Sequence, residues 1–236
     1  MTTMPEVIHG RGFDAEVIRT DRRKTATVKV EQGRVAVVVP KATSAARVES
    51  LVTEKTPWIR KKLLLHRQQT EMKPKEYVSG ECFTYLGRNY RLKVVSHSQR
   101  EVKLLNGRLV VSLPSGSKAP AVIRAALEKW YVQHAKEKLQ EKVDRYAKRL
   151  GLQPAKVRVR DFKSRWGSCT VRGDLTFNWR VIIAPQRIVD YVVVHELCHL
   201  HHHNHSPQFR SSVERILPDY RECREWLKIH AQELVI

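Results

Sequence analysis

Alternating apolar and polar positions in the first half of the chain predict short strands joined by tight turns. Residues 26–30 and 35–39 are rich in Val, and Gln32-Gly33 between them predicts a β-hairpin. Four more strands are expected at 82–85, 89–95, 102–105 and 108–113. Asn106-Gly107 joins the last two, and this dipeptide is a strong signal for a hairpin turn.

Helical spacing appears in two segments that flank these later strands. Residues 45–69 place Val, Leu, Trp and Ile where they form an apolar stripe, and Pro57 predicts a break or a new start. A long helix is expected at 121–150, ended by Gly151. The turn-rich segment 114–120 between strands and helix predicts a domain boundary.

The apolar run at 188–194 contains no Gly or Pro and predicts a well-buried helix that continues into His195-Glu196-Leu197-Cys198-His199. Histidines four residues apart lie on one face of a helix, where both can bind one metal ion. The glutamate between them can reach a metal-bound water. This HExxH pattern is typical of zinc hydrolases, although it also occurs in helices that bind no metal. The long helix at 121–150 is expected to pack behind it.

A catalytic zinc ion usually has three protein ligands and an open position for water. His202 and His203 share the helical face of His195, but would lie roughly 10 to 12 Å farther along the axis if the helix continued. The chain must therefore turn back. Asn204 is the expected place, because Asn tolerates the left-handed conformation, and Ser206-Pro207 predicts the start of a new helix.

His205 lies in this expected turn and is the predicted third metal ligand, with Glu196 as the general base. The neighbouring His201, His202 and His203 are expected to form a solvated helix end. An adventitious metal-binding tract is the alternative explanation for the whole histidine run.

These motifs belong to a longer set of ordered blocks. They are residues 163–169, 175–180, 184–185, 191–200, 204–206 and 218–220, with 57–62 and 85–90 in the first half. In these blocks the chain resembles the YgjP-like metallopeptidases, predicted metal-dependent hydrolases related to SprT-like and WLM zinc proteases. The resemblance covers nearly the whole chain and implies the same three histidine ligands and catalytic glutamate. Cys198 is a mild departure, because a small residue is common there.

A strand at 157–161 and a hairpin at 165–178 are expected before the zinc helix. An edge strand near the metal aligns extended peptides in many zincins, so we expect Trp166-Gly167-Ser168 to line the cleft.

Candidate contacts to the substrate or transition state are Arg165, Asn178 and Tyr220, with a structural role as the alternative for each. Asp190 and Glu214 are candidate hydrogen-bond partners of the ligand histidines.

Composition fits a soluble enzyme. The chain has 236 residues, 42% of them hydrophobic, which is enough for a sizeable core. It contains no run of 18 apolar residues, and its start lacks the features of a signal peptide, so a cytoplasmic location without membrane association is expected. Its four cysteines lack CxxC spacing and are expected to be reduced and mostly buried.

Net charge is a second strong signal. Lys and Arg number 44 against 24 Asp and Glu, which gives a formal charge of +20. Such a protein attracts polyanions, so non-specific nucleic acid is a possible partner. The charge is spread along the chain without a zinc-finger, helix-turn-helix or RNA-recognition signature, and a generally basic surface is the alternative.

Together these features predict an α+β fold. A β-rich α+β accessory module is expected at 1–115, followed at 116–236 by a zincin-like metallopeptidase domain that contains the HExxH helix. No internal repeat is apparent. The expected function is an intracellular zinc metallopeptidase that cleaves protein or peptide substrates with a zinc-activated water. The alternatives are a nucleic-acid-associated module with structural zinc and a zinc hydrolase of a non-peptide substrate.

Overall fold

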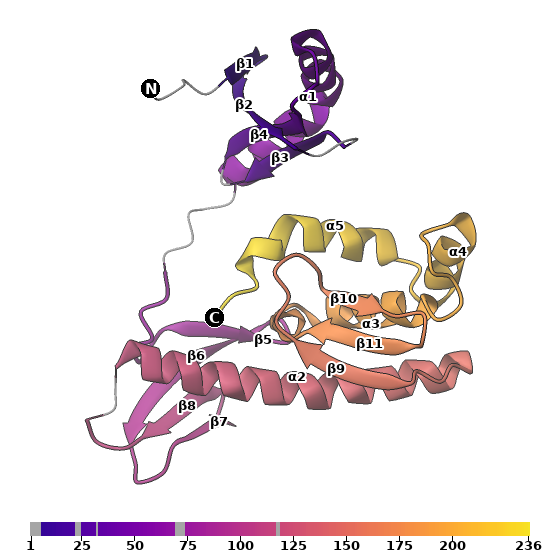
Figure 1. Ribbon diagram of the computed structural model, residues 1–236. Coiled ribbons are helices and arrows are strands. Elements are labelled where there is room, and N and C mark those ends of the chain that lie inside the picture. Colours follow the sequence, from indigo (N-terminus) through magenta and orange to yellow (C-terminus); the bar gives the residue numbers. More distant parts are fainter. Residues whose placement is uncertain (1–5, 22–24, 32, 69–73, 117–118) are drawn as a thin grey trace. The chain divides into compact units, whose positions relative to one another are not determined.

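The computed structural model describes residues 6–21, 25–31, 33–68, 74–116 and 119–236 (Figure 1). The chain divides into two compact units, Met1–Lys73 and Pro74–Ile236. Both units combine helices with strands, as expected for an α+β protein. The division lies before the second group of strands, whereas the sequence predicts a boundary at 114–120.

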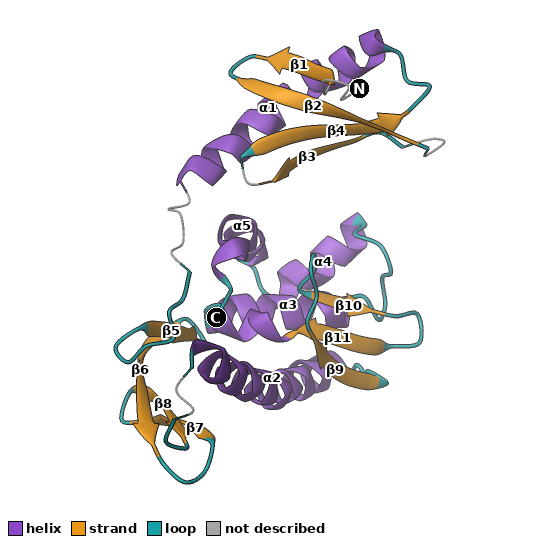
Figure 2. Cartoon of the chain, turned by 60° about the vertical axis from the view of Figure 1, so that its left-hand side comes forward, coloured by secondary structure: helices purple, strands orange, loops and turns teal. Residues whose placement is uncertain are grey.

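The first unit is a four-stranded sheet with one helix across a face (Figure 2). The strands run in the order β1-β2-β4-β3. The elements are β1 (Glu6–Gly10), β2 (Phe13–Thr20), β3 (Thr27–Glu31), β4 (Arg34–Pro40) and α1 (Ala45–Gln68). The predicted hairpin is confirmed, because β3 pairs antiparallel with β4.

Helix α1 is continuous through Pro57, so the predicted break is wrong. A proline inside a helix removes one backbone hydrogen bond, here to the carbonyl of Thr53. Val48 and Val52 before the proline and Ile59 after it are all buried in the core of the first unit. Packing on both sides of Pro57 therefore holds the helix together.

The second unit begins with the four predicted strands, in the order β5-β6-β8-β7. They are β5 (Cys82–Tyr85), β6 (Arg88–Ser96), β7 (Glu101–Leu105) and β8 (Arg108–Leu113). Asn106 and Gly107 both have positive φ, as the predicted hairpin turn requires. The long helix α2 (Pro120–Leu150) follows and ends at Gly151, whose backbone is left-handed.

These strands belong to the second unit because they share its core. Phe83, Leu92 and Val111 from the sheet are buried in one cluster with Leu127 of α2 and with the side chains around the HExxH helix. The continuous core crosses residues 114–120, so turn-forming composition at that segment does not separate two domains.

The two four-stranded sheets have the same topology. Each consists of two antiparallel hairpins whose second strands pair in parallel, and each is followed by a helix. In the second hairpin of each sheet and directly after it, six residue pairs are identical: Val28/Val102, Lys29/Lys103, Gly33/Gly107, Arg34/Arg108, Val37/Val111 and Pro40/Pro114. The chain therefore contains an internal repeat, and the expectation of none is wrong. Interchangeable aliphatic residues in short strands hide such a repeat in the sequence.

The remainder of the second unit carries the HExxH segment. Its elements are β9 (Lys156–Arg160), β10 (Gly167–Cys169), β11 (Asp174–Asn178), the 3-10 helix η1 (Trp179–Ile183), α3 (Gln186–Cys198), α4 (Pro207–Ile216), α5 (Tyr220–His230) and the 3-10 helix η2 (Ala231–Glu233). The sheet order is β10-β11-β9, so β10 is an edge strand. The predicted hairpin is confirmed, since β10 pairs antiparallel with β11.

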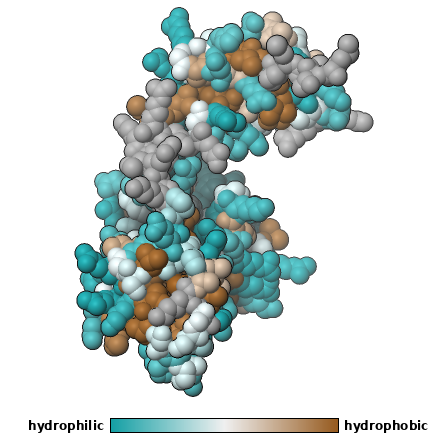
Figure 3. All heavy atoms as spheres, turned by 90° about the vertical axis from the view of Figure 1, so that its left-hand side faces the viewer, coloured by the Kyte–Doolittle hydropathy of each residue, from teal (hydrophilic) through white to brown (hydrophobic). Residues whose placement is uncertain are grey.

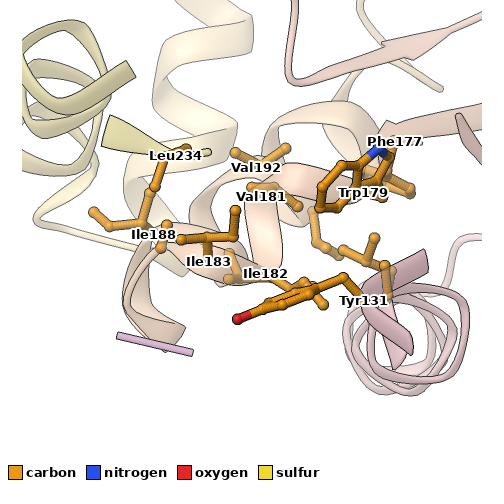
Figure 4. Close-up of a cluster of buried hydrophobic side chains, with 14 of the residues drawn as sticks. Tyr131, Phe177, Trp179, Val181, Ile182, Ile183, Ile188, Val192 and Leu234 are labelled. Carbon is orange, nitrogen blue, oxygen red and sulfur yellow. The ribbon is translucent and has the colours of Figure 1, made fainter. Parts of the chain in front are cut away.

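A dense apolar core supports this region. Helix α2 packs against α3, as predicted, and against η1. Figure 4 shows Tyr131 of α2 beside Ile182 of η1, with Trp179 and Val192 in the same cluster. All four side chains are nearly inaccessible to solvent. This rigid base positions α3 and the segment that follows it.

Hydrophilic side chains cover much of the face shown in Figure 3, interrupted by smaller hydrophobic patches. Among the helices of the described residues, none combines the length and the apolar character that a membrane span requires. All four cysteines are free thiols. Cys198 and Cys223 are buried, Cys169 is half-buried and Cys82 is exposed, so the expectation of mostly buried thiols holds for only two.

Candidate metal centre

Helix α3 presents the HExxH segment at its C-terminal end. His195 lies in the last turn, and His199 is the residue that caps the helix. The N–H of His199 donates to the carbonyl of Glu196, three residues back, which tightens the end of the helix. The helix therefore ends well before Asn204, where the sequence predicts the turn.

Two side-chain hydrogen bonds shape the chain after this helix. Nδ1 of His199 donates to the carbonyl oxygen of His202 at 2.8 Å. Oδ1 of Asn204 accepts from the N–H of Ser206 at 3.3 Å. Asn204 is not among the residues with positive φ, so the predicted left-handed conformation is wrong. The side chains of His199 and Asn204 form the turn instead.

The predicted start of the next helix is confirmed. Oγ of Ser206 accepts a hydrogen bond from the N–H of Phe209 at 3.3 Å, which is the usual role of an N-cap residue. Pro207 is the first residue of α4. The chain thus folds back, and His205 lies next to His195.

Three imidazoles meet at this point. One ring nitrogen from each of His195, His199 and His205 lies within 4.8 Å of the other two. Nε2 of His195 and Nε2 of His205 are 3.1 Å apart. Two ligands of a tetrahedral zinc ion with bonds near 2 Å are separated by about 3.3 Å, so this spacing fits a metal site. His195 and His199 are half-buried and His205 is exposed, which leaves the cluster accessible from one side.

Phe209 completes the cluster, and sequence reasoning missed it. Its ring stacks on His199 with 4.5 Å between centroids, and it meets His195 and His205 edge-on at 4.9 Å each. Phe209 is buried in the first turn of α4. The predicted N-cap at Ser206 and the start of α4 were the available signals, because they place position 209 against the preceding turn.

The environment favours neutral imidazoles. Burial lowers the pKa of His195 to about 3, and the neighbouring His199 and His205 add to this effect. Burial also lowers the pKa of His199. A metal ion binds the neutral form of histidine, so the three residues are suited to hold a divalent cation at neutral pH.

Glu196 lies on the buried side of α3, with 6% of its surface exposed. Burial raises its pKa to about 8, while the positive charge of Arg165 acts in the opposite direction. The edge strand β10 passes directly over this side chain. A Cβ atom at Gly167 would lie 2.6 Å from Oε1 of Glu196, so any other residue at this position would displace the carboxylate.

Arg165 is the only one of the three further candidates with an exposed side chain. Its guanidinium lies 5.7 Å from the ring of Phe162. Together with Trp166 and with Ala231, Gln232, Leu234 and Val235 near the C-terminal end, this loop lines a pocket of 550 Å³. Neither Glu196 nor any of the three histidines lines this pocket.

Asn178 and Tyr220 are buried instead. Nδ2 of Asn178 donates to the carbonyls of Phe162 and Arg165, and its Oδ1 accepts from the N–H of Arg180. These bonds occupy the amide and position the loop before β10. The hydroxyl of Tyr220 accepts a bond from Arg221 at 3.4 Å, and 7% of the tyrosine is exposed.

The two acidic residues expected beside the histidines have other partners. Asp190 binds Lys142 at 2.7 Å and Arg145 at 2.8 Å, and so connects α3 to α2. Glu214 lies 3.5 Å from Arg221. The carbonyl of His202 takes the role predicted for a carboxylate, because it orients the ring of His199.

Three comparisons place the chain among known proteins. A search of the curated proteins finds no match. Among solved structures, the crystal structure of the metallopeptidase zymogen of Pyrococcus abyssi abylysin is similar, with 24% sequence identity and a TM-score of 0.36. The alignment covers 40% of this chain and 93% of that chain. A family model described as YgjP-like, metallopeptidase domain, matches residues 24–230. Since this match spans most of the sequence, the chain belongs to the YgjP-like metallopeptidase family.

Proposed function

We propose that the protein is a zinc-dependent peptidase in which His195, His199 and His205 hold the metal and Glu196 is the general base. The observation that carries the proposal is the convergence of three histidine nitrogens within 4.8 Å, beside a buried carboxylate. A zinc ion held there would supply Lewis-acid chemistry, which lowers the pKa of water towards roughly 7 and polarises an amide carbonyl.

The choice of zinc rests on the donor set. Imidazole nitrogen suits zinc, and three protein ligands with an open position are typical of catalytic zinc sites. Among the described residues, the cluster contains no fourth histidine, cysteine or carboxylate within ligand distance of the three histidines. A structural zinc site has four protein ligands, so this arrangement favours a catalytic role.

Glu196 would move the proton. Its carboxylate accepts a proton from the attacking water and returns it to the nitrogen of the leaving amine. Burial raises the pKa of this carboxyl group, whereas a divalent cation held by the three histidines would favour the carboxylate, which is the form that accepts a proton. Arg165 moderates the effect of burial through its positive charge.

The edge strand β10 would align the substrate. An extended peptide can add to the free edge of a sheet by backbone hydrogen bonds. The close approach of Gly167 to Glu196 puts this edge beside the general base. In this proposal Arg165 binds the substrate, whereas Asn178 positions the loop and Tyr220 packs at the start of α5.

The test compares the wild type with Glu196→Gln in the cleavage of an unfolded protein, with zinc content measured for both. Cleavage by the wild type alone, at equal zinc content, is the expected result. Glu214→Gln is the matched control, because it removes an acidic group from α4 that pairs with Arg221 and should retain activity.

Zinc content decides between the ligand assignment and its alternatives. Loss of zinc is expected in His205→Ala, together with reduced stability. Full zinc occupancy without cleavage of any polypeptide would contradict the peptidase proposal and favour a structural zinc or a non-peptide substrate. Parallel reactions with DNA test whether the charge of +20 recruits nucleic acid.

A further inference from the structure

A groove of 730 Å³ lies in the first unit between β1 and α1. Val7 and Ile8 provide apolar surface inside it, while the side chains of His9, Arg11 and Glu49 are exposed. Thr53, Thr56 and Pro57 line the same groove from the helix. None of these residues belongs to the metal centre.

The internal repeat shows why this groove is open. Gly10 ends β1 and pairs with the first residue of β2, just as Tyr85 ends β5 and pairs with the first residue of β6. The twelfth residue of the helix is Thr56 in α1 and Tyr131 in α2. The buried ring of Tyr131 in the second unit therefore corresponds to a threonine in the first unit. The ring of Tyr85 corresponds to Gly10, over which the ring of Phe13 lies, because a Cβ atom at Gly10 would be 2.5 Å from Cζ of Phe13.

In the second unit the corresponding position is occupied by η1. The N–H groups of Leu86 and Gly87 donate to the carbonyls of Ile182 and Ile183 at 2.7 and 3.2 Å. The ring of Tyr131 lies 6.1 Å from that of Trp179. A hairpin turn and the following helix thus bind a short apolar segment of the same chain, through backbone hydrogen bonds and side-chain packing.

The first unit retains polar backbone groups for such a segment. Gly12 does not itself line the groove but directly follows Arg11, which does. It has positive φ like Gly87, and within the described residues its N–H donates to no backbone carbonyl. Pro57 has no N–H, so the carbonyl of Thr53 lacks its usual helical partner. The turns differ in one respect, since Leu86 has positive φ and Arg11 does not.

We propose that the groove between β1 and α1 binds a short aliphatic segment of the polypeptide substrate. In the second unit the equivalent surface binds Val181-Ile182-Ile183 of η1. The expected ligand therefore has β-branched side chains and accessible backbone carbonyls. The inference rests on the proposed peptidase function. Since both units belong to one chain, binding in the groove would raise the effective concentration of substrate at the metal centre.

The experiment measures binding of a fluorescent peptide to the full-length protein. The probe has the sequence of residues 179–185, and its control has serine at the positions of Val181, Ile182 and Ile183. Thr56→Tyr introduces into the groove the tyrosine that the second unit has at the equivalent position, Tyr131. This variant should weaken binding by about tenfold or more. Ser50→Tyr is the matched control, because Ser50 is exposed on the same helix and does not line the groove.

A second variant tests the groove independently, and thermal melts of both variants show whether weakened binding results from a filled groove or from loss of folding. Thr53→Trp introduces its side chain at an exposed position that lines the groove, so a folded protein with weakened binding is expected. Equal binding of the serine peptide, or unchanged binding in both groove variants, would overturn the proposal. Concentration-dependent dimerisation that Thr56→Tyr removes would assign the groove to a second copy of the chain and also overturn it.

Cleavage assays then connect the groove to substrate. Thr56→Tyr should raise KM for an unfolded protein without changing kcat. A peptide too short to occupy both sites should be cleaved as in the wild type. Peptide binding is measured without turnover, so it tests the groove independently of catalysis. Absence of cleavage would contradict the peptidase proposal, whereas the binding result would still test the groove. An unchanged KM for the unfolded protein would refute the role in substrate recruitment.

Discussion

Gly167 and Glu196 lie so close together that a side chain at position 167 would displace the carboxylate. A Cβ atom at Gly167 would be 2.6 Å from both Cγ and Oε1 of Glu196. The contact joins the edge strand β10 to helix α3 and contributes to the burial of the carboxylate. Glycine at this position therefore allows a substrate-aligning strand and a buried acid to occupy adjacent space.

Gly167→Ala should lower kcat by about a hundredfold, because the added methyl group displaces the carboxylate from its working position. Zinc content should stay at the wild-type level, since the histidines do not contact this glycine. Steady-state kinetics and metal analysis measure the two effects. Ser168→Ala changes the next residue of the same strand and serves as the control; a Gly167→Ala enzyme with normal kcat would disprove the steric argument.

Phe209→Leu should weaken zinc binding by roughly 10- to 100-fold, since the ring contacts all three histidines and holds their orientation. Competition with a chelator measures the affinity. Val213→Ala is the control, because Val213 is buried on the same helix and its truncation should reduce stability with little effect on zinc. Equal zinc affinity in Phe209→Leu and the wild type would contradict the prediction.

Asp190→Asn should destabilise the protein by about 3 kcal/mol, because it leaves the charge of buried Lys142 without its carboxylate partner. Lys142→Met should cost less, since Asp190 retains its contact with the exposed Arg145. Urea denaturation gives both free energies of unfolding. A larger loss in Lys142→Met than in Asp190→Asn would show that the buried lysine does not dominate this pair.

The pKa of Glu196 predicts how the stability of the zinc-free protein depends on pH. Burial raises this pKa from 4.5 to about 8, so between these values the folded state binds more protons than the unfolded chain. The free energy of unfolding therefore falls as pH rises through this window. Glu196→Gln lacks this dependence.

Urea denaturation in the presence of a chelator checks this effect. The free energy of unfolding of Glu196→Gln minus that of the wild type should increase by about 3 kcal/mol between about pH 5 and about pH 8. The histidines are present in both proteins, so their contribution cancels in the difference. A constant difference across this range would show that burial does not perturb Glu196.

Local patterns predict most of the elements correctly. Alternation locates β3 to β8, Asn106-Gly107 locates a hairpin turn, and Ser206-Pro207 locates the start of α4. These features depend on neighbouring residues alone, because turn geometry and capping are determined within a few positions. The HExxH spacing similarly predicts that His195 and His199 share a helical face.

Long-range packing explains the failures. Pro57 does not interrupt α1 because Val52 and Ile59 are both held in the core. The boundary near residue 115 is absent because one core spans the segment. Asn178 is a polar residue at a strand end, which makes it a candidate substrate contact. Its side-chain amide instead makes hydrogen bonds to three backbone groups, those of Phe162, Arg165 and Arg180.

Motif spacing and turn signals are local properties, so the amino-acid sequence is enough to predict the family, the α+β character and the three histidines with their glutamate as candidates. The contacts of Phe209 with the histidines and of Gly167 with Glu196 are visible only in the folded chain. The same holds for the strand topology that the first unit shares with the second unit and for the groove beside it. Each of these depends on side chains brought together from separate elements, and their contacts follow from packing that no local pattern records.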